Sequence, residues 1–246
     1  MCIRDSITTI IAAIILFIFG SGPVKGFKIP LFVVILKKLF SFFFIEILIK
    51  TIYEKIKKSI PDKAGLGGGS MNAASILRYL AHKRIINIKN KEMLKISKLI
   101  GSDVMLGLNH KSKILNSRNK IKYFNNVKKI YPLIIKPNFG CSTKDIYSKV
   151  RKFDKVKFGK GAKKMFDINF LKDMKNSLET VAFLKYPRLK YMKLYLENSL
   201  NPVFVRMTGS GSALVAYFQT KKRCERAKKR FIQKYKNIWC IASKTI

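Results

Sequence analysis

The chain has 246 residues, of which 48% are hydrophobic, so it is long enough for one large or two medium domains with a real core. Its 51 Lys and Arg outweigh 13 Asp and Glu, and the net charge of +38 attracts polyanions such as nucleic acid, anionic lipid or nucleoside triphosphates. The spacing of the four cysteines and of the isolated His82 and His110 favours neither a zinc site nor a disulfide framework. We expect reduced thiols and a cytoplasmic protein.

Two apolar runs open the sequence, ITTIIAAIILFIFG at 7–20 and LFVVILKKLFSFFFIEILI at 31–49. A membrane-spanning helix needs about 20 apolar residues, whereas the first run is shorter and charged residues interrupt the second. We interpret 8–18 as a buried strand, 30–42 as a helix and 53–60 as an edge strand. A membrane-inserted or exported chain is the alternative interpretation.

A glycine-rich stretch, AGLGGGSMNAA at 64–74, precedes a segment whose apolar residues recur at helical spacing, with Ser70 placed to cap that helix. Glycine lets consecutive backbone N–H groups turn toward one point, and a helix N-terminus adds unpaired donors and its positive dipole end. The stretch is neither a GxxxxGK[ST] loop nor a GxGxxG dinucleotide motif. It predicts a phosphate cradle, and a flexible linker is the alternative.

The next segment, KEMLKISKLI at 91–100, reads as a helix that ends at Gly101 in a left-handed conformation. Asp103 follows at once, so this acid is expected at a turn rather than on a helix face. YPLIIKPN at 131–138 begins a new strand-like unit, and we place a domain boundary between residues 130 and 131.

The C-terminal part continues the alternation of helices and strands. Helical patterns are predicted at 168–183 and 187–200. A second Gly/Ser loop at 208–212 leads into an apolar strand, and a basic helix at 220–235 closes the chain.

Two of these motifs resemble those of the GHMP small-molecule kinase superfamily. IPDKAGLGGGSMNAA at 60–74 is similar to its phosphate-binding second motif, and VRMTGSGSALVAYF at 205–218 is similar to its third. GSDV at 101–104, PNFGCSTKDIY at 137–147 and NSLETVAFLKYP at 176–187 resemble the branch that acts on 4-diphosphocytidyl-2-C-methyl-D-erythritol. The resemblance runs from about residue 50 to the C-terminus.

The resemblance implies an α+β, two-domain GHMP-kinase-like fold. Its N-terminal ATP-binding domain, similar to the second domain of ribosomal protein S5, would span 1–130, with 1–50 atypical or truncated. A ferredoxin-like α/β sandwich would span 131–246. The implied cosubstrate is ATP with Mg²⁺, the implied partner is a small-molecule substrate, and neither nucleic acid nor a membrane is implied.

The resemblance also implies site residues. Asp103 would be the catalytic base toward the accepting hydroxyl, and the second Gly/Ser loop would support the first from the other domain. The residues implied to hold the triphosphate are Pro61, Asp62, Lys63, Ala64, Gly65, Leu66, Gly67, Gly68, Gly69, Ser70, Met71, Gly209, Ser210, Gly211 and Ser212. Which residues would ligate the metal ion is left open.

The sequence departs from the family pattern in several places. The N-terminal Pro-Ala-Lys-x-Asn-Leu and Asp-Gly-Tyr-His segments, which carry the partner of the catalytic acid and a cytidine contact, do not occur. Met71, Met105 and Ser177 replace the usual Ser, Pro and Asp. We therefore expect a truncated or misjoined start and low turnover. The alternatives are another GHMP kinase with a mevalonate-type or sugar substrate, and a basic nucleic-acid-binding protein.

Overall fold

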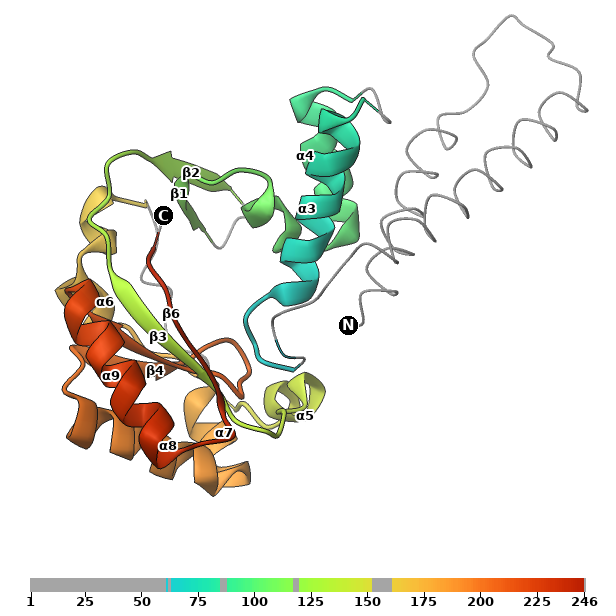
Figure 1. Cartoon of the computed structure of the whole chain (residues 1–246). Helices are drawn as coiled ribbons and strands as arrows, with labels where there is room; N and C mark the ends of the chain where they lie inside the picture. Colours follow the sequence, from blue (N-terminus) through green and yellow to red (C-terminus); the bar gives the residue numbers. More distant parts are fainter. Residues whose placement is uncertain (1–60, 62, 85–87, 117–119, 152–160, 246) are drawn as a thin grey trace, which may run out of the picture. The chain divides into compact units, whose positions relative to one another are not determined.

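The computed structural model describes residues 61, 63–84, 88–116, 120–151 and 161–245 (Figure 1). The chain divides into two compact units. One contains Gly69–Asn109, and the other contains the segment ending at Gly68 together with His110–Ile246. The elements predicted at 8–18, 30–42 and 53–60 lie outside the described residues, and the boundary at 130/131 stays a prediction.

The first unit is helical in its described part. Helix α3 (Gly68–His82) buries one face, as its periodicity predicts, through Ala73, Ala74, Ile76, Leu77 and Leu80. Helix α4 (Asn90–Ile100) follows, and the carboxylate of Glu92 accepts the Lys89 N–H at 2.7 Å at its start. A short 3₁₀ helix, η1 (Val104–Gly107), ends the unit.

Two local predictions for this unit are wrong. Ser70 lies inside the first turn of α3, because the helix already begins at Gly68 after a positive φ of 66° at Gly67. Gly101 does end α4, but in an extended conformation with φ 170° and ψ 152° rather than a left-handed one. Its N–H still donates to Ser97 O at 3.1 Å, so the last turn closes without a left-handed residue.

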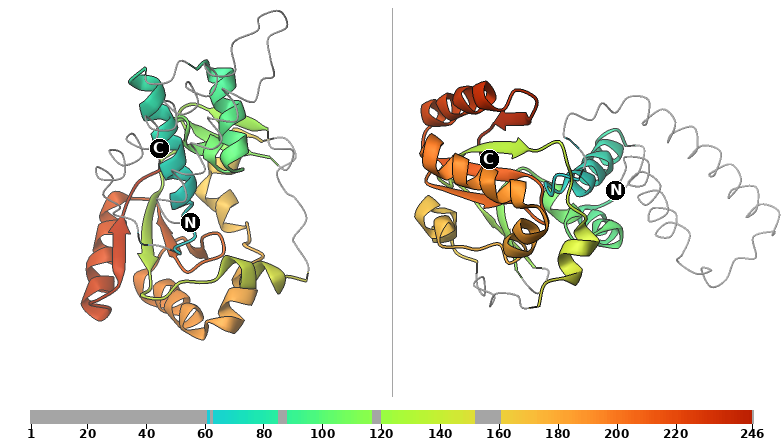
Figure 2. Two further views of the ribbon diagram at one scale, coloured as in Figure 1. Left: turned by 90° about the vertical axis from the view of Figure 1, so that its right-hand side faces the viewer. Right: turned by 90° about the horizontal axis from the view of Figure 1, so that it is seen from below.

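The second unit contains a four-stranded antiparallel sheet in the order β4-β5-β3-β6. Its strands are β3 (Tyr131–Lys136), β4 (Phe204–Met207), β5 (Leu214–Phe218) and β6 (Trp239–Ala242). Helix α8 (Pro187–Leu200) packs on β4 and β5, and helix α9 (Lys221–Lys234) packs on β3, β5 and β6 and beside α8 (Figures 1 and 2). The order strand–helix–strand–strand–helix–strand is that of a ferredoxin-like sandwich, as expected.

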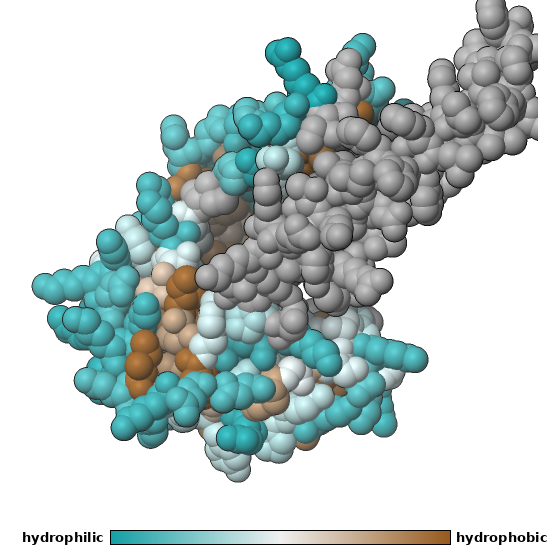
Figure 3. Space-filling model, turned by 45° about the vertical axis from the view of Figure 1, so that its right-hand side comes forward, coloured by the Kyte–Doolittle hydropathy of each residue, from teal (hydrophilic) through white to brown (hydrophobic). Residues whose placement is uncertain are grey.

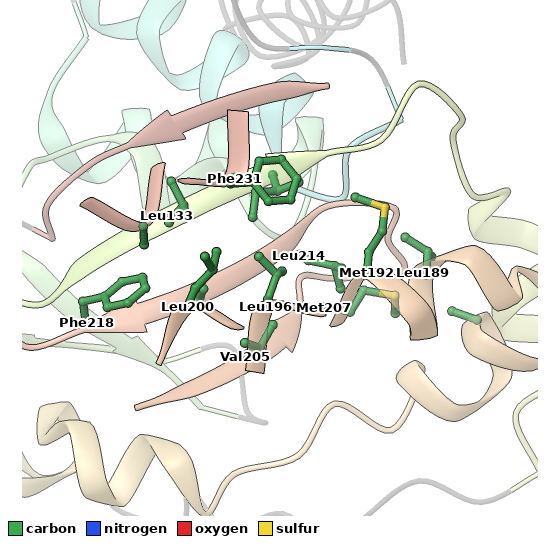
Figure 4. Close-up of a cluster of buried hydrophobic side chains, with 14 of the residues drawn as sticks. Leu133, Leu189, Met192, Leu196, Leu200, Val205, Met207, Leu214, Phe218 and Phe231 are labelled. Atoms are coloured by element: carbon green, nitrogen blue, oxygen red, sulfur yellow. The ribbon is translucent and has the colours of Figure 1, made fainter. Parts of the chain in front are cut away.

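The core of this unit lies between the sheet and helices α8 and α9 (Figure 4). Alternate residues of β5 and every third or fourth residue of the helices point into it, which are the strand and helix periods. The fully buried large side chains of this core include Leu133, Ile135, Leu189, Leu196, Met207, Phe218 and Phe231. The predicted helices at 187–200 and 220–235 and the strand at 131–138 are thereby confirmed.

The connection from β3 to β4 carries α5 (Thr143–Ser148), η2 (Lys163–Phe166), α6 (Ile168–Lys172) and α7 (Glu179–Lys185). The single helix predicted at 168–183 is therefore wrong. The chain turns between α6 and α7, where the side-chain oxygen of Asn176 accepts the Leu178 N–H at 3.0 Å.

A hairpin of β1 (Ser112–Leu115) and β2 (Ile121–Phe124) precedes β3 in the same unit. It was not predicted, because its two strands are only four residues long each and lie within a longer polar stretch. In the described part of the chain, no helix is both long and apolar enough to cross a membrane.

Candidate active site

The structure joins the two predicted Gly/Ser loops within the second unit. The Ala213 N–H donates to Ala64 O at 3.1 Å, and the Ser212 N–H donates to Lys63 O at 3.3 Å. The hydroxyl of Thr208 donates to the carbonyl of Gly65 at 3.0 Å, across 143 positions of sequence. The loop before α3 is therefore hydrogen-bonded, backbone to backbone, to the loop that connects β4 and β5, and it is not a free linker.

Glycine is required where these loops meet. Gly65 has a φ of 69°, and a Cβ there would lie 2.4 Å from Thr208 O and 2.8 Å from Gly211 O. Gly209 has a φ of 52°, and its Cβ would lie 2.9 Å from Gly65 O. Because these neighbours are backbone atoms, no side-chain rotation would relieve the overlap.

The next two glycines have open space instead. Among the described residues, a Cβ at Gly67 or Gly68 would meet nothing within 4 Å, and Gly68 is the first residue of α3. The N–H groups of the first helical turn have no partner inside the helix, and the dipole makes this end positive. An anion approaching Gly67 and Gly68 would thus meet backbone donors without obstruction from side chains, which fits a phosphate group.

A third segment, residues 137–143, contacts both loops. The Ser212 hydroxyl donates to Phe139 O at 2.6 Å, and the hydroxyls of Thr143 and Ser210 lie 2.9 Å apart. Gly140 lies so close to Lys63 that a Cβ would be 2.5 Å from that residue's own Cβ. The PNFGCST motif, residues 137–143, therefore packs against both loops, and we call it the platform of the loops.

A buried lysine holds this platform at the end of β3. The ammonium of Lys136, which is 5% exposed, donates to Pro137 O at 2.6 Å and to Phe139 O at 2.8 Å. Burial lowers the pKa of Lys136, and burial likewise raises the pKa of the Cys141 thiol to about 11. The motif pointed to this segment, but sequence reasoning assigned no role to Lys136, Phe139 or Thr143.

Asp103 lies in the first unit at a turn, as predicted, directly before η1. Its side chain is exposed, and its Oδ1 accepts a long hydrogen bond of 3.4 Å from the Ser102 hydroxyl. The far end of η1 packs on α3: a Cβ at Gly107 would be 2.4 Å from the Cβ of Ala74 and 3.2 Å from the sulfur of Met71. The segment that bears Asp103 is therefore packed directly on the helix that follows the glycine loop.

The predicted phosphate-binding residues fall into three groups. Those in contact across the two loops are Lys63, Ala64, Gly65, Gly209, Gly211 and Ser212, with Ser210 bonded to the platform. Leu66 and Gly67 lead into α3 and Gly68 is its first residue, while Gly69, Ser70 and Met71 belong to the first turns of α3 in the other unit. Pro61 precedes the loop, and Asp62 lies outside the described residues.

The face of the molecule drawn in Figure 3 is largely hydrophilic over the described residues, with hydrophobic patches between the hydrophilic side chains. A pocket of about 450 Å³ next to the second loop is lined by Thr208, Gly209, Lys175, Arg206 and Tyr147, among others. In the described ranges, no group of three His, Cys, Asp or Glu side chains could hold a metal ion.

Comparison with known proteins identifies the family. Residues 32–111 match the GHMP kinases N terminal domain. The chain is 52% identical over 192 residues to 4-diphosphocytidyl-2-C-methyl-D-erythritol kinase of Pelagibacter ubique (strain HTCC1062), covering 78% of this chain and 68% of that protein. It is 34% identical over 198 residues to the kinase of the same name from Clostridium tetani (strain Massachusetts / E88), covering 78% and 70%.

Solved structures agree on the fold. A crystal structure of 4-(cytidine 5'-diphospho)-2C-methyl-D-erythritol kinase matches with a TM-score of 0.62 at 24% identity, over 76% of this chain and 68% of that one. Homoserine kinase from Cytophaga hutchinsonii matches with a TM-score of 0.58 at 13% identity, over 77% and 68%. With two glycine loops joined as described and a relative of this identity, the chain belongs to the 4-diphosphocytidyl-2-C-methyl-D-erythritol kinase family of the GHMP kinases.

Proposed function

We propose that this protein transfers the γ-phosphoryl group of ATP to the 2-hydroxyl of 4-diphosphocytidyl-2-C-methyl-D-erythritol, a step of the non-mevalonate route to isoprenoid precursors. The observation that carries the proposal is the hydrogen-bonded pair of glycine loops at the start of α3, with open space at Gly67 and Gly68. The identity of the acceptor is inferred from the relatives, which are named as kinases of 4-diphosphocytidyl-2-C-methyl-D-erythritol.

The loops account for the nucleotide half of the reaction. Phosphoryl transfer depends on positioning the triphosphate and neutralising its charge. In our proposal the backbone N–H groups from Gly65 to Met71 wrap the phosphates at the N-terminus of α3, while residues 209–212 hold the first loop in shape. Mg²⁺ would be carried largely by the phosphates themselves, as is usual for this ion, and would neutralise their charge.

Asp103 accounts for the acceptor half. A base within reach of the accepting hydroxyl takes its proton as the new bond to phosphorus forms. Asp103 is exposed, and its carboxylate accepts a long hydrogen bond from the Ser102 hydroxyl, so its oxygens are accessible to a substrate hydroxyl. The packing of Gly107 on α3 would keep this carboxylate at a constant distance from the helix that follows the phosphate loop.

The test is product identity. The purified chain is incubated with Mg·ATP and the proposed acceptor, and in parallel with mevalonate, homoserine and galactose; phosphorylated products are measured by mass spectrometry against the Asp103→Asn variant. We expect phosphorylation of the diphosphocytidyl acceptor alone. Because turnover is expected to be low, the same assay is run on a variant in which residues 1–50 are exchanged for the N-terminal segment of the Pelagibacter ubique relative. Phosphorylation of a different acceptor, or none by either protein, would refute the proposal.

A further inference from the structure

The amide of Asn176 holds the entry to the second Gly/Ser loop. Its Nδ2 donates to Met207 O at 2.9 Å and to Gly209 O at 2.8 Å, the carbonyls on either side of Thr208. Its Oδ1 accepts the Leu178 N–H at 3.0 Å, which fixes the orientation of the amide. All three hydrogen-bonding positions used by this side chain are thus directed at backbone groups.

The carboxylate of Glu179 acts on the same strand end. Its Oε1 accepts the Met207 N–H at 3.0 Å, and its Oε2 accepts from the ammonium of Lys193 at 3.0 Å. Both side chains of this ion pair are largely shielded, with 17% of Glu179 and 21% of Lys193 exposed. Lys193 lies on α8, so the bond ties the end of β4 to the helix layer.

These contacts continue into the first glycine loop. Thr208, bracketed by the two carbonyls that Asn176 binds, donates its N–H to Ala213 O at 3.0 Å and accepts the Gly211 N–H at 2.9 Å. Its hydroxyl is then directed to Gly65 O. A shift of the backbone at 207–209 would therefore move the hydrogen bond that joins the two loops.

We infer that Asn176 and Glu179 are positioning residues for nucleotide binding: through Met207, Thr208 and Gly209 they hold the second loop in the conformation that supports the first. The expected effect on ATP affinity rests on the proposed function. The effect of these residues on the conformation of the loops does not, because it can be measured without a nucleotide. Neither residue is proposed to touch substrate.

The variants separate the loss of a hydrogen bond to the loop from a change in side-chain size. Asn176→Asp keeps the shape and the acceptor for Leu178 but replaces both donors by an oxygen facing two carbonyls. Glu179→Ala removes the acceptor for the Met207 N–H, and Glu179→Gln restores an acceptor of the same reach. Asn169→Asp is the matched control, since Asn169 is exposed on α6 and undergoes the same chemical change.

Two measurements are made on each full-length variant. The first is amide hydrogen exchange without nucleotide, for peptides covering 63–65 and 207–213, together with the melting temperature. The second is the Kd for Mg·ATP by calorimetry. We expect Asn176→Asp and Glu179→Ala to exchange at least about tenfold faster in both peptides and to bind ATP about tenfold more weakly. Asn169→Asp should resemble the unmodified chain. Glu179→Gln should recover most of the protection and affinity that Glu179→Ala loses, because it keeps the acceptor for the Met207 N–H although it gives up the ion pair with Lys193.

The possible results distinguish a failure of this inference from a failure of the proposed function. Unchanged exchange in folded Asn176→Asp would overturn the inference, as would faster exchange accompanied by unchanged ATP affinity. If Asn176→Asp fails to fold, the Glu179 pair decides, and a Glu179→Gln variant no better than Glu179→Ala would overturn it. If the unmodified chain bound no ATP, the proposed function would fail, while the exchange data would still decide whether these residues order the loops.

Discussion

Replacing Gly107 by alanine is expected to disturb both stability and catalysis, because this glycine allows η1 to pack on α3. The new Cβ would lie 2.4 Å from the Cβ of Ala74, about 1 Å short of ordinary contact, which begins at 3.4 Å. The sulfur of Met71, 3.2 Å away, is on a flexible side chain and can yield, but the Cβ of Ala74 moves only with the backbone of α3. The overlap must therefore be relieved by separating the two segments.

The size of the effect follows from that displacement. Overpacking of a folded interior costs about 1–3 kcal/mol, which for a protein of this size lowers the melting temperature by about 2–12 °C. If Asp103 is the base, a shift of about 1 Å in the helix that follows it is expected to lower kcat by up to about 10²-fold. The KM for ATP should change less, since the bonds between the two Gly/Ser loops do not involve η1.

The assay compares melting temperature and steady-state kinetics of Gly107→Ala with those of Gly101→Ala. Gly101 precedes the same 3₁₀ helix, its backbone is extended, and its Cβ would be 3.6 Å from Val104 Cγ2, an ordinary contact. We expect Gly101→Ala to leave both quantities nearly unchanged. Equal behaviour of the two variants would refute the argument that close packing at Gly107 sets the position of Asp103.

Three further predictions use other parts of the site. Gly68→Val should leave the melting temperature nearly unchanged, because a Cβ at this position meets no atom of the described residues within 4 Å. It should weaken Mg·ATP binding at least about tenfold by calorimetry, since the branched side chain would occupy the phosphate cradle; unchanged affinity would show that no phosphate sits there. Asp103→Asn should lower kcat by about 10²- to 10⁴-fold with little change in ATP affinity, and near-normal turnover would assign the proton to another group. Burial raises the pKa of Cys141 and Cys224 to about 11 and that of Cys240 to about 12. Because the thiolate is the reactive form, iodoacetamide should label these residues slowly at pH 8 and faster as pH rises toward 11, as followed by peptide mass spectrometry; rapid labelling of the folded protein at pH 8 would contradict the burial.

The elements that sequence alone predicted are those whose signals are local. Helix α8 matches its predicted range because buried residues recur every three or four positions from Leu189 to Leu200, and β3 and β5 are continuous apolar runs. The glycine cluster before α3 was identified by composition and motif, since few other segments need so many flexible residues before a helix. Asp103 was placed at a turn because a helix-ending glycine precedes it.

Other features depend on contacts that no local pattern encodes. The hydrophobic pattern of 168–183 suggested one helix, but the chain turns at Asn176. The side chain of Asn176 accepts the Leu178 N–H and donates to the carbonyls of Met207 and Gly209, which lie far along the chain. The hairpin of β1 and β2 and the strand β6 are short, and pairing with a neighbour decides them more than their own propensity.

The tertiary structure alone decided how the candidate site is held together. The sequence shows two glycine-containing loops, but only the fold brings Gly65 against Thr208 and makes a side chain at either junction impossible. The need for glycine at position 107 could not be predicted from the sequence either, because it arises from the close approach of Ala74 on another helix. Local propensity depends on neighbouring residues, whereas such contacts depend on where distant segments pack, and that is determined by burial of the whole core rather than by any one motif.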